Sequence, residues 1–143
     1  MNKLQSITKL HNRYFVLRHG RSKANDEELI VSHPDEGTSG YGLTEAGKEQ
    51  VRISVTHAKG KGILDAATII YSSDFVRARE TAEIAKEVLG SEEVILTSKL
   101  RERYFGSWDK KHNAHYQDVW NDDEKNPHHK IQTSFSHLFN RGQ

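Results

Sequence analysis

Cysteine is absent from this 143-residue sequence. Its absence excludes disulfide bonds, thiolate metal sites and cysteine nucleophiles, and a reducing cytoplasm is the compartment that fits this composition. Long hydrophobic runs are also lacking, because no stretch approaches the roughly 20 apolar residues of a membrane-spanning helix. The first nine residues do not contain the continuous apolar core of a signal peptide. We therefore expect a cytoplasmic protein with no membrane partner.

The sequence has no marked excess of charge of one sign. Lys and Arg number 21 and Asp and Glu number 20, which gives a formal net charge of +1 with neutral histidines. These charges are interspersed along the chain, so a nucleic-acid partner is not indicated. Apolar residues make up only 34% of the chain and become sparse after Trp120. The length suits one domain with a modest core, and we expect residues 1–143 to form a single domain of unknown oligomeric state.

Strand-like and helix-like segments alternate along the chain. Short apolar runs predict strands at residues 14–17, 68–71 and 94–96. Thr44 is expected to cap a first long helix that ends at the glycines 60 and 62, and residues 72–74 to form a turn and cap for a second that ends at Gly90. The residues expected on the buried faces are Ala46, Val51, Val55 and Ala58 in the first helix and Phe75, Ala78, Ala82, Ala85 and Leu89 in the second. This order predicts an α/β fold with parallel crossovers.

Two further segments lack this regularity. Residues 21–42 show no hydrophobic period and are rich in polar residues and glycine, which predicts a long loop. Loops of that length in compact domains are usually functional or disordered. After Gly106 the sequence turns polar, and the spacing of its apolar residues up to Trp120 indicates one more helix of poor amphipathicity.

A candidate phosphate site follows the first expected strand. The segment Arg18-His19-Gly20-Arg21-Ser22 lies at its carboxyl end, where open α/β sheets bind their ligands. Arginine presents a planar fork that matches phosphate oxygens, and glycine allows backbone and ligand to approach closely. On its own this short motif favours an exposed basic strand end, because any basic loop can contain Arg-His-Gly.

Four segments in this order resemble motifs of the histidine phosphatase superfamily, whose members are phosphoglycerate-mutase-like. Residues 18–25 resemble the opening RHG-x-[ST]-x-x-N, and residues 42–47 resemble the helix start written LTE.G. Residues 72–82 resemble S-x-L-x-R-A-x-x-T-A, and residues 100–106 resemble L-x-E-x-x-x-G. The resemblance covers residues 14 to about 108. It implies a three-layer α/β/α fold in which residues 107–143 form a polar, lid-like segment and a divergent tail.

The resemblance also implies roles for individual residues. His19 is the expected nucleophile that becomes a transient phosphohistidine, and Glu102 is the expected proton shuttle. The expected phosphate-binding residues are Arg18, Arg21, Ser22, Asn25 and Arg77, with Arg18 and Arg77 also counted as catalytic. No metal and no cofactor is required, and the expected partner is a small phosphorylated metabolite. The implied function is a phosphomonoester phosphatase, with a phosphoglycerate mutase or an inactive phosphate-binding module as alternatives.

Several of these residues have a simpler alternative role. An arginine in the first turns of a helix, at position 77 or 79, is often exposed and paired with a glutamate such as Glu80 or Glu83. Glu102 could pair with a neighbouring arginine at 101 or 103, and Asn25 could be a plain turn residue. We favour Arg77 over Arg79 because only Arg77 fits the Arg-Ala pair of the motif.

Histidines gather in the final third, which holds five of the nine: His112, His115, His128, His129 and His137. A metal site is one interpretation of this cluster. No carboxylate or cysteine completes a known ligand spacing, so a solvated polar segment is the favoured one.

One expected motif is missing. Members of the family carry a second histidine in a later Ser-His-Gly-like motif at the end of a strand, and nothing here matches it, because His137 follows no apolar strand and precedes Leu138. In the family that strand lies between the two strands that precede the Arg-His-Gly and Arg-Ala motifs. We therefore expect a truncated or frame-shifted product that lacks the middle of its sheet, with unpaired backbone groups on both sides of the gap. Such a chain should be a poor catalyst and a poor folder.

Overall fold

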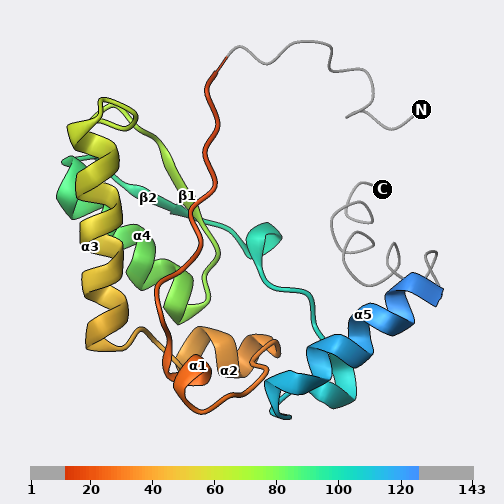
Figure 1. Ribbon diagram of the computed structural model, residues 1–143. Coiled ribbons are helices and arrows are strands. Elements are labelled where there is room, and N and C mark those ends of the chain that lie inside the picture. Colours follow the sequence, from red (N-terminus) through yellow and green to blue (C-terminus); the bar gives the residue numbers. More distant parts are fainter. Residues whose placement is uncertain (1–11, 126–143) are drawn as a thin grey trace, which may run out of the picture.

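The computed structural model of the chain describes residues 12–125 (Figure 1). Strand β1 (Ile70–Ser72) pairs in parallel with β2 (Val94–Leu96), with Ile70 opposite Val94 and Ser72 opposite Leu96. The helices are α1 (Lys23–Asp26), α2 (Pro34–Ser39), α3 (Glu45–Gly60), α4 (Val76–Leu89) and α5 (Tyr116–Lys125), and the short 3-10 turns are η2 (Ser98–Leu100), η3 (Gly106–Trp108) and η4 (Asn113–His115). The crossover from β1 through α4 to β2 confirms the expected α/β fold.

Helix α3 begins where the sequence predicts. The Thr44 hydroxyl accepts a hydrogen bond from the Gly47 backbone N at 3.0 Å, as an N-cap does, and Val51 and Val55 are buried. The prediction that Ala46 lies on the buried face is wrong, because Ala46 is exposed and Gly47 is buried. Gly47 faces inward because the backbone of Arg21 crosses the helix there.

Helix α4 follows β1 after a short turn. Its N-cap is Phe75, without a side-chain cap hydrogen bond, and Asp74 instead pairs with Arg101, so the predicted cap within residues 72–74 is wrong. Ser73 does stabilise the turn, because its hydroxyl accepts from the Phe75 backbone N at 3.2 Å. Gly90 ends the helix with φ of 78°, which confirms the expected left-handed C-terminal glycine.

The hydrophobic core lies between α3, α4 and β1. Six buried residues form it, with Leu64, Ile70 and Val88 packed at its margin: Leu43, Val51, Val55, Ile84, Ala85 and Leu89. A second buried contact joins Phe75 to α2, where the ring lies so close to Gly37 that a Cβ there would be 2.5 Å from the Phe75 ring. The core therefore uses the inward faces of both predicted helices.

Residues 14–17 do not form the buried strand that their apolar run predicts. Within residues 12–125 they pair with no strand, and Figure 1 draws them as a coil that leads into α1. Val16 is 100% exposed and Tyr14 is 67% exposed. An extended segment needs a neighbouring backbone to become a strand, and here neither β1 nor β2 takes that place. This agrees with the expected gap in the sheet.

The predicted loop at 21–42 contains two short helices. Local capping explains them: Ser22 caps α1, and His33 precedes Pro34 at the first position of α2. The two ends of this segment are joined beside the N-cap of α3, because Lys23 N donates to Gly42 O and Thr44 N donates to Arg21 O, both at 2.9 Å.

The middle of the same segment is joined to the polar residues after Glu102. Ile30 N donates to Lys111 O at 2.9 Å, and Lys110 N donates to Ile30 O at 2.7 Å. One Asp109 carboxylate oxygen accepts hydrogen bonds from Ser32 N, Ser32 Oγ and His33 N at 2.7–2.9 Å. Burial raises the pKa of Asp109, but these hydrogen bonds outweigh it and hold the pKa below its usual value. Residues 28–33 and 105–113 thus form one hydrogen-bonded unit.

Helix α5 confirms the expected additional helix, and it lies apart from α3 and α4 (Figure 1). Arg103 holds it to the preceding loop through an ion pair with Asp123 at 2.6 Å. No helix within residues 12–125 is long and apolar enough to span a membrane.

Candidate active site

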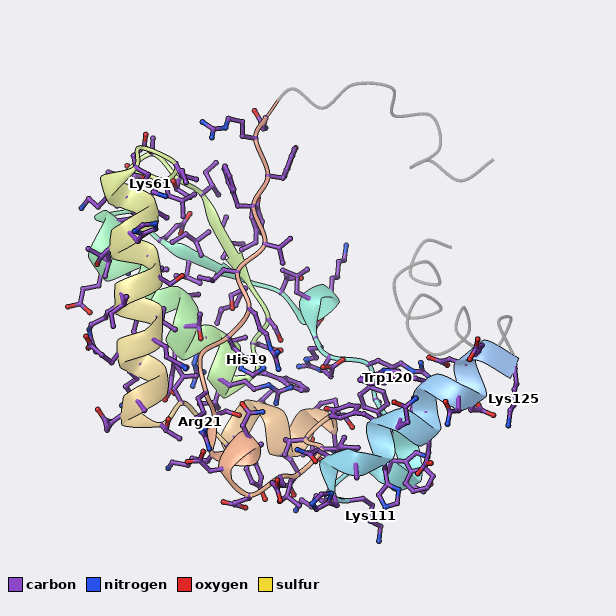
Figure 2. All side chains as sticks on the ribbon, in the orientation of Figure 1. His19, Arg21, Lys61, Lys111, Trp120 and Lys125 are labelled. Atoms are coloured by element: carbon purple, nitrogen blue, oxygen red, sulfur yellow. The ribbon has the colours of Figure 1, made fainter. Side chains whose placement is uncertain are left out.

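His19 lies where the chain passes between α3 and the start of α4 (Figure 2). The neighbouring Gly20 N donates to the Thr81 hydroxyl of α4 at 3.2 Å. On the other side a Cβ on Gly20 would lie 2.4 Å from the Gly47 carbonyl oxygen of α3, which is too close for any other residue. Two helices, rather than a sheet, therefore position the Arg-His-Gly motif.

The His19 ring has a defined orientation. Its Nδ1 lies 2.8 Å from the Gly20 carbonyl oxygen. A carbonyl only accepts, so Nδ1 carries the proton and Nε2 keeps its lone pair. Burial lowers the pKa of His19, the Gly20 hydrogen bond opposes it, and the positive charges of Arg77 and Arg18 lower the pKa further. The neutral ring is the form favoured at neutral pH.

Arg77 comes to this ring from the first turn of α4. It is 8% exposed, its Nη1 donates to the Val31 carbonyl oxygen at 3.1 Å, and its guanidinium lies 5.1 Å from the Phe75 ring centre. The surface ion pair that an arginine at this position often makes is therefore not formed. Arg79 is exposed and lines an open groove of about 320 Å³ between α3 and α4. The two arginines thus occupy different environments.

Glu102 lies close enough to His19 and Arg77 for its charge to act on both. Its carboxylate accepts from Arg103 N at 3.0 Å. The side chains of Arg101 and Arg103 are bound elsewhere, to Asp74 at 2.5 Å and to Asp123 at 2.6 Å. The alternative pairing of Glu102 with a neighbouring arginine is therefore not formed, and the two ion pairs hold its backbone from both sides.

The other predicted phosphate-binding residues support the loop after His19. Asn25 Oδ1 accepts from Ser22 N and from Ser22 Oγ, both at 3.0 Å, while Ser22 Oγ accepts from Asn25 N. This reciprocal capping closes α1 and leaves the Asn25 amide nitrogen without a hydrogen bond among residues 12–125. The guanidinium of Arg21 contacts Asp26. The structure therefore gathers His19, Arg18, Arg77 and Glu102, and it places the Arg21 guanidinium against Asp26.

Tyr116 is a further member of this cluster, and none of the four sequence motifs includes it. Its charge neighbours are Asp109 and three groups that also act on His19, namely Glu102, Arg77 and Arg18. Burial and the nearby Glu102 raise the pKa of its phenol. The sequence predicts that Tyr116 lies in or near a helix after Gly106. Its approach to the charged groups of the site depends on how α5 packs.

No cluster of three potential metal ligands occurs within residues 12–125. His112 and His115 instead contact Glu28 and Asp118 at 3.2 and 2.8 Å. The remaining histidines of the proposed cluster, His128, His129 and His137, lie outside the described residues, as does the divergent tail.

Comparison with known proteins identifies the family of this chain. Residues 14–143 match the sequence pattern of the histidine phosphatase superfamily, branch 1. A probable phosphoglycerate mutase of Escherichia coli is 38% identical over 98 residues, which is 68% of this chain and 41% of that protein. The chain thus spans about two fifths of the length of this curated relative.

Solved structures give the same family. A mycobacterial glucosyl-3-phosphoglycerate phosphatase is similar with a TM-score of 0.53 and 26% identity, over 79% of this chain and 48% of that one. A phosphoserine phosphatase from Entamoeba histolytica has a TM-score of 0.51 and 29% identity, over 70% of this chain and 44% of that one. The match over most of the sequence, with His19 oriented as described, places this chain in the histidine phosphatase superfamily.

Proposed function

We propose that this chain carries the phosphoryl-accepting site of a phosphomonoester phosphatase that works through a phosphohistidine at His19. The observation that carries the proposal is the 2.8 Å contact between His19 Nδ1 and the Gly20 carbonyl oxygen, which leaves Nε2 as the ring atom with a lone pair. The lowered pKa of His19 supports it, because a protonated ring cannot attack phosphorus.

The proposed reaction has two steps. The Nε2 lone pair of His19 attacks phosphorus and the bond from phosphorus to the alkoxide oxygen breaks, while Glu102 gives a proton to the leaving oxygen. Water then attacks the phosphohistidine, Glu102 takes up a proton from it, and the bond from phosphorus to Nε2 breaks to return the neutral ring. Glu102 must carry a proton in the first step and lose it to the leaving oxygen; its proximity to the ring, seen in its electrostatic effect on His19, supports this role.

Charge on the phosphoryl oxygens would be met by Arg18 and Arg77. Their positive charges already act on the His19 ring. Arg77 needs no reorganisation to do so, because it is buried and held by Val31. The amide nitrogen of Asn25 would be a further donor, because the capping contacts use only its oxygen. Ser22 would act by holding this loop, and Arg21 would add positive charge at its rim. The expected substrate is a small phosphorylated metabolite.

A direct experiment is to offer p-nitrophenyl phosphate to the chain and denature it rapidly in alkali, in which phosphohistidine survives. Intact mass should show one phosphoryl group on the wild type and none on His19→Ala. His57→Ala is a matched control, because His57 is exposed in the last turn of α3. A folded chain that neither releases p-nitrophenolate nor becomes phosphorylated would instead be a non-catalytic phosphate-binding module.

A phosphoglycerate mutase is the second candidate. The observation that favours it is the 38% identity to the probable phosphoglycerate mutase. A mutase returns the phosphoryl group to a second hydroxyl of the substrate, whereas a phosphatase transfers it to water. Phosphoglycerate isomerisation without release of inorganic phosphate would therefore identify a mutase.

A further inference from the structure

We propose that the Tyr116 hydroxyl is a further phosphate-binding group, which donates a hydrogen bond to a phosphoryl oxygen held by Arg77. The inference rests on the proposed function and extends its site to α5, a helix that none of the four motifs includes.

A continuous series of contacts connects Arg77 with Tyr116. The Arg77 guanidinium donates to the carbonyl oxygen of Val31. The next residue, Ser32, accepts a hydrogen bond from Phe105 N through its hydroxyl at 3.1 Å. The Phe105 ring in turn meets the Tyr116 ring edge to face, with centres 5.3 Å apart and planes at 85°. Tyr116 is therefore attached to the same backbone segment that holds Arg77.

The Tyr116 ring is fixed on its other side too. It stacks on Trp120, one turn further along α5, with ring centres 6.0 Å apart and planes at 18°. Two aromatic neighbours leave the half-buried ring little rotational freedom, so the direction of its hydroxyl is largely set before any ligand binds.

The hydroxyl is chemically suited to an anion. It makes no hydrogen bond with any residue in the range 12–125, so it is available as a donor. Arg18, Arg77 and Glu102 act electrostatically on the Tyr116 phenol as they act on His19, and Asp109 adds a second carboxylate on the side of Tyr116. Burial raises the pKa of Tyr116, so the phenol keeps its proton and donates rather than repels. Bound phosphate would complete the hydrogen bonding of this tyrosine.

The test uses inorganic phosphate as the probe, with its dissociation constant measured by calorimetry on the full chain. Tyr116→Phe removes only the hydroxyl and keeps both ring contacts, so we expect unchanged thermal unfolding and phosphate affinity weakened on the order of tenfold. Tyr104→Phe is the matched control, because Tyr104 is 50% exposed and its ring contacts His33 instead. Affinity of the control should equal that of the wild type.

A second variant separates the hydroxyl from the ring. Tyr116→Leu should lose about as much phosphate affinity as Tyr116→Phe if the hydroxyl is the binding group. Equal affinity of Tyr116→Phe and the wild type, or a loss confined to Tyr116→Leu, would overturn the inference and leave the proposed function intact. A folded wild type that binds no phosphate would refute both.

Discussion

At the scale of single residues, the surroundings of His19 determine which of its atoms can react. The Gly20 carbonyl occupies the Nδ1 proton, and two arginines discourage a second proton on Nε2. These surroundings lead to two measurable predictions. One concerns the pKa of the His19 ring, and the other concerns the replacement of Arg77.

We predict that His19 titrates below its usual value of 6.5. Phosphoryl transfer to the ring should then stay constant as the pH falls through 6.5 and decline only at lower pH. The unfolded chain takes up this proton more readily, so the contribution of His19 to stability is present above pH 6.5 and is lost as the pH falls through the lower folded value. Nitrogen-15 NMR of the imidazole would measure the midpoint, and a midpoint at or above 6.5 would contradict the prediction.

Arg77 and Arg79 should differ sharply when changed to lysine. Arg77 is buried and fixed by Val31, so Arg77→Lys should lower the yield of phosphohistidine by about tenfold or more through loss of the guanidinium fork. Arg79→Lys should stay near the wild-type yield, because Arg79 is exposed beside α3. Equal sensitivity of the two variants would show that the Arg-Ala motif has been aligned to the wrong arginine.

At the scale of elements, the backbone of Arg21 crosses the first turn of α3 in close contact with Gly47. A Cβ on Gly47 would lie 2.0 Å from the Arg21 carbonyl oxygen, and that carbonyl is also bound by Thr44. The loop that carries His19 is therefore supported directly by the helix start that the second motif describes.

We predict that Gly47→Ala destabilises the fold by about 1–3 kcal/mol and displaces the His19 loop. Gly60→Ala is the control on the same helix, since nothing lies within 4 Å of a Cβ there, and it should be neutral or stabilise by up to about 1 kcal/mol. Denaturant unfolding of both variants gives the comparison. A Gly47→Ala variant as stable as the control would refute the close crossing.

Elements with a local signal could be predicted from the sequence. Helices α3 and α4, the pair β1 and β2, the Thr44 cap and the left-handed Gly90 follow from period, capping and glycine placement. Segment 14–17 could not, because an apolar run becomes a strand only beside another backbone. The exposure of Ala46 and the pairing of Asp74 with Arg101 depend on neighbours distant in sequence, and the two short helices within 21–42 depend on caps too local to produce a period.

The candidate site could likewise be predicted only in part from the sequence. Motif order identified His19, Arg18, Arg77 and Glu102, which the fold brings together. The motifs could not indicate that Arg21 turns to Asp26, nor that Tyr116 reaches the same charges, because both depend on how later segments pack.

At the scale of the whole molecule, apolar surface remains exposed beside the two-stranded sheet. Val16 is fully exposed, and Ile69, just before strand β1, and Tyr71, within it, are 71% and 61% exposed. Surface of this kind and unpaired strand edges favour association between chains.

We predict that backbone amides at 14–17 exchange with solvent almost as fast as in an unfolded chain, because within residues 12–125 they donate to no backbone carbonyl. Amides in the interior of α4 should exchange far more slowly, since that helix packs into the core. Hydrogen exchange followed by mass spectrometry, on the monomer isolated by gel filtration, measures both. Strong protection across 14–17 in that monomer would rule out the open arrangement.

The unit formed by residues 28–33 and 105–113 has a consequence for protein engineering. Asp109 binds Ser32 and His33, and the backbones of Ile30, Lys110 and Lys111 join the two stretches directly. A chimera that takes only one stretch from a relative would break these contacts and leave buried donors unsatisfied. Both stretches should therefore be exchanged together as a single cassette in chimeras between members of the superfamily.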